Sequence, residues 1–476
     1  MRAPCPKAPI VHTDSVRQDV QQLEQLLTLP TRRHIQDVRI AAVLPAYNEE
    51  ESIAATIESI LGQTRVPDAV FVLVNNSTDE TYFVAREYDG VHTRTYRDHQ
   101  YTCQVKVIDL GEVPDKKVGA LNFGYALAKD FDYLLGVDGD TVLDRRAVQY
   151  MTEEILSDSR IGGISAIYGF DQSQAKTGME RFLVRSQRFQ FAGFNMDNLL
   201  RSRNMAVLGG QASLLNIEAM KRTMAENRQD TPWVTDSEIE DSLLSLQLKS
   251  AGYRTKISAK ARAVVGPMLT MRSLDAQQVK WNAGGVELIL QKPLHANLRL
   301  RWRENIAMIT NLMSRVLFVA LAAASVSIGA FEFAWWWAVP PVVSVLLTLR
   351  IAVSIKGYTA RDVLYALAFL PGEIYMFLRG IHFLKAWTQV LTRTERDNWA
   401  AQAKAENGGG GGFGWLLGLL GVVLIAAVLG WGWLNLLPPV QTTLLAVGWT
   451  ALAVVTILQT LAMLSKLFRR HRGFTV

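Results

Sequence analysis

The chain has 476 residues, with 50 Lys and Arg against 44 Asp and Glu, which gives a formal charge of +6. That length accommodates two or three domains, and its two cysteines, Cys5 and Cys103, exclude a disulfide framework or a cysteine-rich metal site. The positive excess falls near apolar segments and no basic patch carries base-stacking aromatics, so we expect lipid contact and no nucleic acid binding.

The N-terminal segment, residues 1–37, contains no apolar run of signal-peptide length. We therefore expect the domain that follows it to stay in the cytoplasm. The spacing of Val20, Leu23, Leu26 and Leu27 predicts a short amphipathic helix in this arm.

Residues 38–285 alternate apolar runs of strand length with helix-like segments. The runs lie at 39–47, 69–76, 104–110 and 133–140, and the helix-like segments at 49–64, 77–88 and 117–130. Strand and helix alternation with uninterrupted apolar strands predicts an α/β domain whose parallel sheet is covered on both faces.

Polar clusters follow three of these apolar runs. They are Pro45 to Glu49, Asn75 to Asp79 and Asp138-Gly-Asp140. Because ligands of such sheets bind outside the carboxyl ends of the strands, we expect the three clusters to form one cleft.

The chemistry of the clusters points to a nucleotide diphosphate. Asp138 and Asp140 can jointly hold Mg²⁺ or Mn²⁺ bridging phosphate oxygens, and Lys117 stands at the start of a predicted helix, where anions bind. An Asp-x-Asp pair can also be a solvated turn, but its position after a buried strand favours a site. Neither a P-loop nor a Gly-x-Gly-x-x-Gly element is present.

The remainder of the chain, residues 315–476, is predicted to be a membrane domain of about four spans. The four apolar segments are 316–337, 339–355, 413–436 and 440–464, with a Gly-rich linker at 405–412. The loops containing "WWWAVPP" and "NLLPPVQ" lack Lys and Arg, whereas "KGYTARD", "TRTERDNWAAQAK" and "SKLFRRHRG" are basic. The positive-inside rule then predicts an inner-membrane protein with its large N-terminal domain and both termini in the cytoplasm.

Two further segments are expected at the membrane surface. Residues 286–314 are basic and amphipathic, and should lie on the inner leaflet. Residues 362–388 are interrupted by Pro371, Glu373, Arg379 and Lys385, and fit an interfacial or re-entrant helix pair. An ordinary span broken by Pro371 is the alternative.

Taken in order, the motifs of residues 40–281 resemble those of the membrane-integrated family 2 glycosyltransferases, a group that includes synthases of hyaluronan, cellulose, chitin and poly-N-acetylglucosamine. The matching elements are "LPAYNEE", "VNNSTDET", "KVGALN", "DGD", "IEDSLLSLQL" and "QQVKW". The resemblance implies a GT-A-like fold, Rossmann-like in its sheet. One departure is Lys280, which stands where the family has Arg and lacks the bidentate fork of a guanidinium.

The resemblance also implies roles for individual residues. Asp241, next to Glu240, would be the catalytic base, and Asp138 and Asp140 would hold the metal. Gly210 and Gln211, with Trp281, would bind the acceptor. The residues implied in donor binding are Pro45, Tyr47, Glu49, Asn76, Asp79, Lys117, Asn122, Asp138, Gln277, Lys280 and Trp281. Asp241 could instead merely favour a helix dipole, and Trp281 could be a core aromatic.

The implied function is inverting transfer from a nucleotide-diphospho-sugar, a UDP-sugar on resemblance, to a growing β-linked polysaccharide, with secretion of the polymer as an extension of this role. The runner-up is addition of a single sugar to a polyprenyl phosphate or glycolipid. A non-catalytic scaffold would have no use for the three aspartates, and a nucleotidyltransferase would have no use for the spans. The sugar, the linkage and the oligomeric state stay open.

Overall fold

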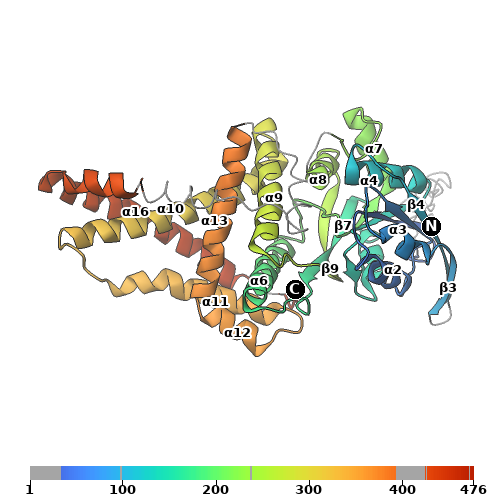
Figure 1. Cartoon of the computed structure of the whole chain (residues 1–476), viewed down its shortest axis with the longest axis horizontal. Coiled ribbons are helices and arrows are strands. Elements are labelled where there is room, and N and C mark those ends of the chain that lie inside the picture. Colours follow the sequence, from blue (N-terminus) through green and yellow to red (C-terminus); the bar gives the residue numbers. More distant parts are fainter. Residues whose placement is uncertain (1–33, 97–98, 236–238, 393–423, 425, 471) are drawn as a thin grey trace, which may run out of the picture.

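The computed structural model describes residues 34–96, 99–235, 239–392, 424, 426–470 and 472–476. The predicted N-terminal helix, the Gly-rich linker and half of the predicted span 413–436 lie outside these residues. In Figure 1 an α/β domain lies on the right, and the apolar helices extend from it to the left.

The described residues of the α/β domain form a nine-stranded sheet in the order β3-β4-β2-β1-β5-β8-β7-β9-β6. The strands are β1 (Ile40–Ala46), β2 (Ala69–Val74), β3 (Gly90–Tyr96), β4 (His99–Asp109), β5 (Tyr133–Val137), β6 (Val142–Leu143), β7 (Ile161–Phe170), β8 (Ala212–Asn216) and β9 (Arg254–Val265). The run β4-β2-β1-β5 is parallel, as predicted, whereas β8 runs antiparallel to both β5 and β7. The sheet is therefore mixed: the expectation of a parallel sheet holds for the run β4-β2-β1-β5 and for the pair β7 and β9, whereas β3, β6 and β8 run antiparallel to their neighbours.

Helices cover both faces of this sheet. The first-half helices are α2 (Ile53–Leu61), α3 (Thr81–Arg86), α4 (Lys116–Ala128), α5 (Ala147–Ile155), α6 (Gly178–Leu200), α7 (Ile217–Asn227), α8 (Glu240–Ser250) and α9 (Met271–Gln291). Alternate residues of β1 enter different cores: Ile40 and Leu44 pack with α2 and α5, and Val43 packs with α4 and α8. Both faces of the strand are buried, which explains its uninterrupted apolar sequence.

Helix α4 lies close to the sheet because it carries Gly124. A Cβ at Gly124 would lie 2.3 Å from Val43 Cγ1 and 2.9 Å from Leu73 Cδ1. The glycine thus lets α4 approach β1, and this approach sets the position of Lys117 in the first turn of the helix.

The second half consists of α10 (Arg299–Ser327), α11 (Val339–Ser354), α12 (Ala360–Leu367), α13 (Leu370–Leu391) and α16 (Pro438–Phe468), with the short 3₁₀ helices η1 (Ala296–Leu298) and η2 (Trp335–Ala338). Among the described residues, three helices are long and apolar enough to cross a membrane, in the segments Ala296–Ser327, Trp335–Ser354 and Pro438–Phe468. Much of their apolar surface is exposed. Apolar surface of this extent needs lipid around it, so the protein associates with a membrane.

The first of these helices differs from its predicted bounds. The expected span 316–337 does not continue past Ser327, because the chain turns at Gly329, whose φ is +69°. The apolar part of α10 instead extends toward the N-terminus. Residues 286–314 are divided between the end of α9 and the first half of α10.

Segment 362–388 contains a sharp bend. Helices α12 and α13 meet at 73°, as in a broken span or a re-entrant loop. Figure 1 shows α13 beside α9, with both running across the direction of α10 and α16. Arg315 on α10 holds Glu373 at the start of α13 through two hydrogen bonds of 2.7 and 2.9 Å.

The α/β domain is fastened to these helices by buried charge. Asp362 on α12 is fully buried and accepts hydrogen bonds from Arg185 at 3.3 Å and from Arg188 at 2.8 Å, both on α6. Lys385 of α13 also bonds Asp275 of α9 at 2.8 Å, in a more exposed ion pair. Because removing one partner of a buried ion pair is costly, the contacts of Asp362 help to fix the α/β domain relative to the membrane helices.

Candidate active site

The loops after β1 and β2 meet at the carboxyl edge of the sheet, as the sequence predicted. The backbone amide of Asn48 donates to Ser77 Oγ at 3.1 Å, and the Asn48 side chain accepts from the amide of Thr78 at 2.8 Å. The Glu49 side chain also reaches the third cluster. Its Cγ lies 2.9 Å from the position that a Cβ would occupy at Gly139. The three polar clusters therefore form one surface.

Asp138 follows β5 directly and has a cationic partner. Lys117 Nζ, from the first turn of α4, donates to Asp138 Oδ1 at 2.5 Å. Burial alone would lower the pKa of Lys117, but the carboxylates of Asp138, Glu240 and Asp241 outweigh it and hold that pKa above its ordinary value. The amine is therefore charged at neutral pH and available to an anionic ligand.

Asp140 stands two residues further along the chain. Burial, and then the charge of Asp138, raise the pKa of Asp140 to about 6, while Lys117 and a hydrogen bond from the Gly266 backbone oppose the rise. A carboxyl group whose pKa is raised by a neighbouring carboxylate marks a site where a cation would be stabilised.

The residues present fit a divalent ion shared with a ligand. Within the described part of the chain, no group of three or more His, Cys, Asp and Glu side chains could hold an ion unaided. Mg²⁺ and Mn²⁺ prefer oxygen ligands, and a site with few carboxylates is completed by substrate phosphates. Asp138 and Asp140 supply the protein's share of such a set.

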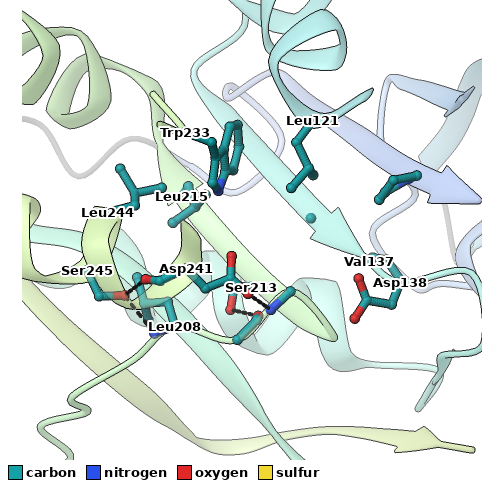
Figure 2. Close-up of a pocket in the computed structure, with 14 residues that line it drawn as sticks. Leu121, Val137, Asp138, Leu208, Ser213, Leu215, Trp233, Asp241, Leu244 and Ser245 are labelled. Atoms are coloured by element: carbon teal, nitrogen blue, oxygen red, sulfur yellow. Dashed lines mark hydrogen bonds between the residues drawn. The ribbon is translucent and has the colours of Figure 1, made fainter. Parts of the chain in front are cut away.

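Glu240 and Asp241 occupy the first turn of α8, facing the Asp138 side of the cleft. The Gly210 backbone amide donates to Asp241 Oδ2 at 2.7 Å, and Ser245 Oγ joins the Asp241 carbonyl at 2.7 Å to the Leu208 amide at 2.8 Å. Figure 2 shows these bonds tying the start of α8 to the loop before β8. The loop and the helix thus hold the Asp241 carboxylate in place.

The environment makes Asp241 basic. Burial, and then the charge of Glu240, raise the pKa of Asp241 to about 7, while Lys117 and the Gly210 amide oppose the rise. Burial also raises the pKa of Glu240, against the charges of Lys117 and Lys280. A carboxylate with a pKa near neutrality is matched to general base catalysis.

Gly210 lies where the charged groups converge. A Cβ built there would lie 3.0 Å from Asp138 Oδ1, 3.1 Å from Lys117 Nζ and 3.2 Å from Asp241 Oδ2. Beneath this point is a small cavity of about 20 Å³, lined by apolar side chains that include Leu121 and Trp233 (Figure 2). The glycine leaves the three polar groups room to reach one another.

A much larger cavity, of about 1290 Å³, extends from the carboxylates along α6 and α9 to the membrane helices. The sequence-predicted residues that line it are Pro45, Tyr47, Glu49, Asn76, Lys117, Asp138, Asp140, Gln211, Glu240, Asp241, Gln277, Lys280 and Trp281. The structure thus brings together motifs that are spread over more than two hundred positions of the chain.

The Gln-x-x-Lys-Trp element lies on the wall formed by α9. Gln277 and Lys280 are buried, and the Trp281 ring meets Phe191 edge to face with centroids 5.8 Å apart. Phe191 in turn packs against Tyr168 with centroids 5.3 Å apart. Trp281 is therefore both packed against aromatic neighbours and accessible from the cavity.

Three predicted residues do not line the large cavity. Gly210 lies at the small one. Asp79 binds the Thr81 hydroxyl at 2.5 Å and the Glu50 amide at 3.2 Å, which stabilises the loop before α3. Asn122 binds the amide and the carbonyl of Trp233 at 3.1 and 2.8 Å. The structure therefore places Asp79 and Asn122 as supports of neighbouring segments, outside the lining of the large cavity.

Other cavity residues belong to no motif. Tyr168 on β7, Gln190 on α6 and Tyr375 on α13 line the same wall, and the Tyr375 hydroxyl donates to Gln190 Oε1 at 2.6 Å. Arg301 and Arg379 line the part of the cavity near the membrane helices. Only weak sequence signals pointed to these residues. Gln190 is a polar residue between two phenylalanines of α6, and Arg379 is an arginine within the apolar α13.

Two family models match the chain over these elements. One, described as glycosyl transferase family 2, matches residues 41–222, and the other, described as glycosyl transferase family group 2, matches residues 133–355. Together they cover the sheet, the cleft and the first membrane helices. The chain belongs to glycosyltransferase family 2. Its GT-A-like domain followed by apolar helices confirms the predicted fold class.

The chain is also similar to curated synthases of a polysaccharide. It is 27% identical over 269 residues to poly-β-1,6-N-acetyl-D-glucosamine synthase of Staphylococcus epidermidis, covering 56% of this chain and 59% of that protein. It is 26% identical over 256 residues to the synthase of Staphylococcus aureus strain COL, covering 53% and 56%. The match therefore spans little more than half the length of these relatives.

Among solved structures, the chain is similar to the mannosyltransferase PcManGT from Pyrobaculum calidifontis in complex with GDP-Man and Mn²⁺. The identity is 15% and the TM-score is 0.47, with coverage of 80% of this chain and 96% of that one.

Proposed function

We propose that this glycosyltransferase is a polysaccharide synthase that transfers a sugar from a UDP-sugar to a growing β-linked chain at the cytoplasmic face of a membrane. The large cavity that joins the carboxylates to the membrane helices is the observation that carries this proposal. N-acetylglucosamine is the first sugar to test, because the curated relatives are named as synthases of its polymer.

The proposed chemistry begins with the acceptor hydroxyl, which is a weak nucleophile. Asp241 takes its proton, and the Gly210 amide holds the carboxylate toward the cleft. Attack on the side opposite the departing diphosphate inverts the anomeric carbon. A donor with an α linkage would therefore give a β-linked product.

The leaving group is the nucleotide diphosphate, on which negative charge gathers. The charged amine of Lys117 lies where it can neutralise that charge, beside Asp138. A divalent cation held by Asp138 and Asp140 would supply Lewis-acid stabilisation of the same phosphates. Lys280 lines the same cavity, and its charge acts on Glu240.

The cavity suits a saccharide chain. Its wall combines aromatic rings, such as Phe191 and Trp281, with amides that include Gln190, Gln278 and Asn282. Sugars present apolar C–H faces to rings and hydroxyl groups to amides, so this part of the wall suits a neutral polymer. The basic loops support the orientation with the α/β domain inside the cell.

A donor screen tests this proposal. The purified full chain, in nanodiscs with Mg²⁺ or Mn²⁺, is given UDP-N-acetylglucosamine, UDP-glucose, UDP-glucuronate and GDP-mannose in turn, and released nucleotide is measured. We expect release with a UDP-sugar, and much less with the double variant D138N/D140N. Nucleotide release only with GDP-mannose would contradict the proposed UDP-sugar donor. A small product that is extracted with lipid would favour the addition of a single sugar to a lipid carrier.

A further inference from the structure

The membrane side of the large cavity carries two arginines that the transfer reaction does not use. Arg301, at the start of α10, donates from Nη2 to Ser242 Oγ at 3.0 Å, and its Nη1 lies 3.4 Å from where a Cβ on Gly285 would stand. Its guanidinium is thus fixed between α8 and α9, on the cavity wall. Arg379 reaches the same cavity from the middle of α13.

Positive charge is in excess around these two side chains. Glu304 is the carboxylate whose charge acts on both Arg301 and Arg379, and it lies 3.9 Å from Arg201 as well. Lys249 is adjacent: burial, and then the charges of Arg301 and Arg201, lower the pKa of Lys249 to about 8. One acid therefore faces three guanidinium groups and an amine.

Other cations on this wall are already matched. Lys466 forms a 2.7 Å ion pair with Asp197, and Arg350 bonds the last carbonyls of α16, including those of Lys466 and Arg469 at 2.6 Å. Among the described residues, Arg301 and Arg379 form no salt bridge within 4.0 Å; Arg350 forms none either, but its guanidinium is hydrogen-bonded to three carbonyl groups. Both side chains are half-buried, and a positive charge that is partly withdrawn from water is stabilised by an accompanying anion.

The position of Arg301 and Arg379 indicates the source of an anion that would accompany them. Arg301 precedes the apolar part of α10, a helix long and apolar enough to cross the membrane. The same cavity is lined by Met308, Ile351 and Met376, which are apolar residues of α10, α11 and α13. The site thus has charged groups at one end and membrane helices at the other, which matches the headgroup level of a bilayer.

We propose that Arg301 and Arg379 bind a phosphate group, and that its source is the headgroup of an anionic membrane lipid entering the cavity between the membrane helices. The planar guanidinium offers paired N–H donors that fit two phosphate oxygens at once. Neither arginine contacts the residues assigned to donor phosphate or to the base, so lipid binding can be measured without sugar transfer.

The test is a binding titration of the full chain in uncharged detergent. Dioctanoyl phosphatidylglycerol, dioctanoylglycerol and inorganic phosphate are added separately, and the thermal midpoint Tm is followed. We expect the anionic lipid to raise Tm in a saturable manner, with no such rise for the phosphate-free lipid. In R379Q and in R301Q the apparent Kd should increase about tenfold or more, since a hydrogen-bonded charge is lost.

R303Q is the matched control, because Arg303 is an exposed arginine of the same helix that does not line the cavity. It should keep the wild-type Kd. R301Q also removes the hydrogen bond to Ser242 and could destabilise the fold. If R301Q folds poorly, the test rests on R379Q, which leaves that bond intact. An equal Tm rise with inorganic phosphate would overturn the lipid source, and an unchanged Kd in R379Q would overturn the site itself.

Discussion

Replacing Asp241 with Asn removes the proposed proton acceptor with little change of shape. In the wild type, the Gly210 amide nitrogen lies 2.7 Å from Asp241 Oδ2. The side-chain carbonyl oxygen of Asn can accept the same hydrogen bond, so the loop before β8 should keep its place. Loss of general base catalysis lowers turnover about 10²–10⁴-fold, which corresponds to about 3–5 kcal/mol of transition-state stabilisation. Donor affinity should change little, because the phosphates are expected at Lys117 and Asp138.

The assay compares steady-state nucleotide release with donor Kd from calorimetry for wild type and D241N. D130N, at an exposed aspartate on the opposite side of the domain, controls for loss of one carboxylate. Turnover of D241N within about threefold of wild type would show that another group takes the proton. A large loss of donor affinity with normal turnover at saturation would place Asp241 at the donor instead.

Three further outcomes are expected. Because the raised pKa of Asp241 is about 7 and the base acts when deprotonated, kcat/KM should rise with pH through about 7, and a flat profile from pH 5.5 to 8.5 would contradict this assignment. G210A should lower kcat/KM about tenfold to a hundredfold, since overpacking costs about 1–3 kcal/mol, whereas G169A, whose Cβ would meet nothing within 4 Å, should be neutral in the same assay. Excess EDTA should abolish nucleotide release and Mn²⁺ or Mg²⁺ should restore it, while full activity in EDTA would argue against an ion at Asp138 and Asp140.

The parallel half of the sheet was predictable because each of its central strands is buried on both faces. An uninterrupted apolar run such as Ile40–Ala46 has no other stable environment in a soluble domain. The hairpin of β3 and β4 was not predicted as a pair, because β3 is mostly polar, as in "HTRTY", and contains no apolar run. The antiparallel place of β8 between β5 and β7 depends on long-range pairing, which no local pattern encodes.

The bounds of the membrane helices were also only partly predictable from the sequence. Hydropathy continues from α10 through the aromatic residues before α11, so the sequence suggested one span up to Trp337, whereas the chain turns at Gly329. The positions of Asp138, Lys117 and Asp241 in one cleft followed from strand-end reasoning and family motifs. The cavity wall formed by α6 and α13 did not, because it depends on how α13 packs against α9.

The most direct test of polymer synthesis is the size of the product. The purified full chain, in nanodiscs, is incubated with radiolabelled UDP-N-acetylglucosamine and a divalent metal, and the product is separated by gel electrophoresis and by lipid extraction. A high-molecular-weight product that is absent with D241N is the predicted result. Label found solely in a lipid-extractable product of one added sugar would contradict the account.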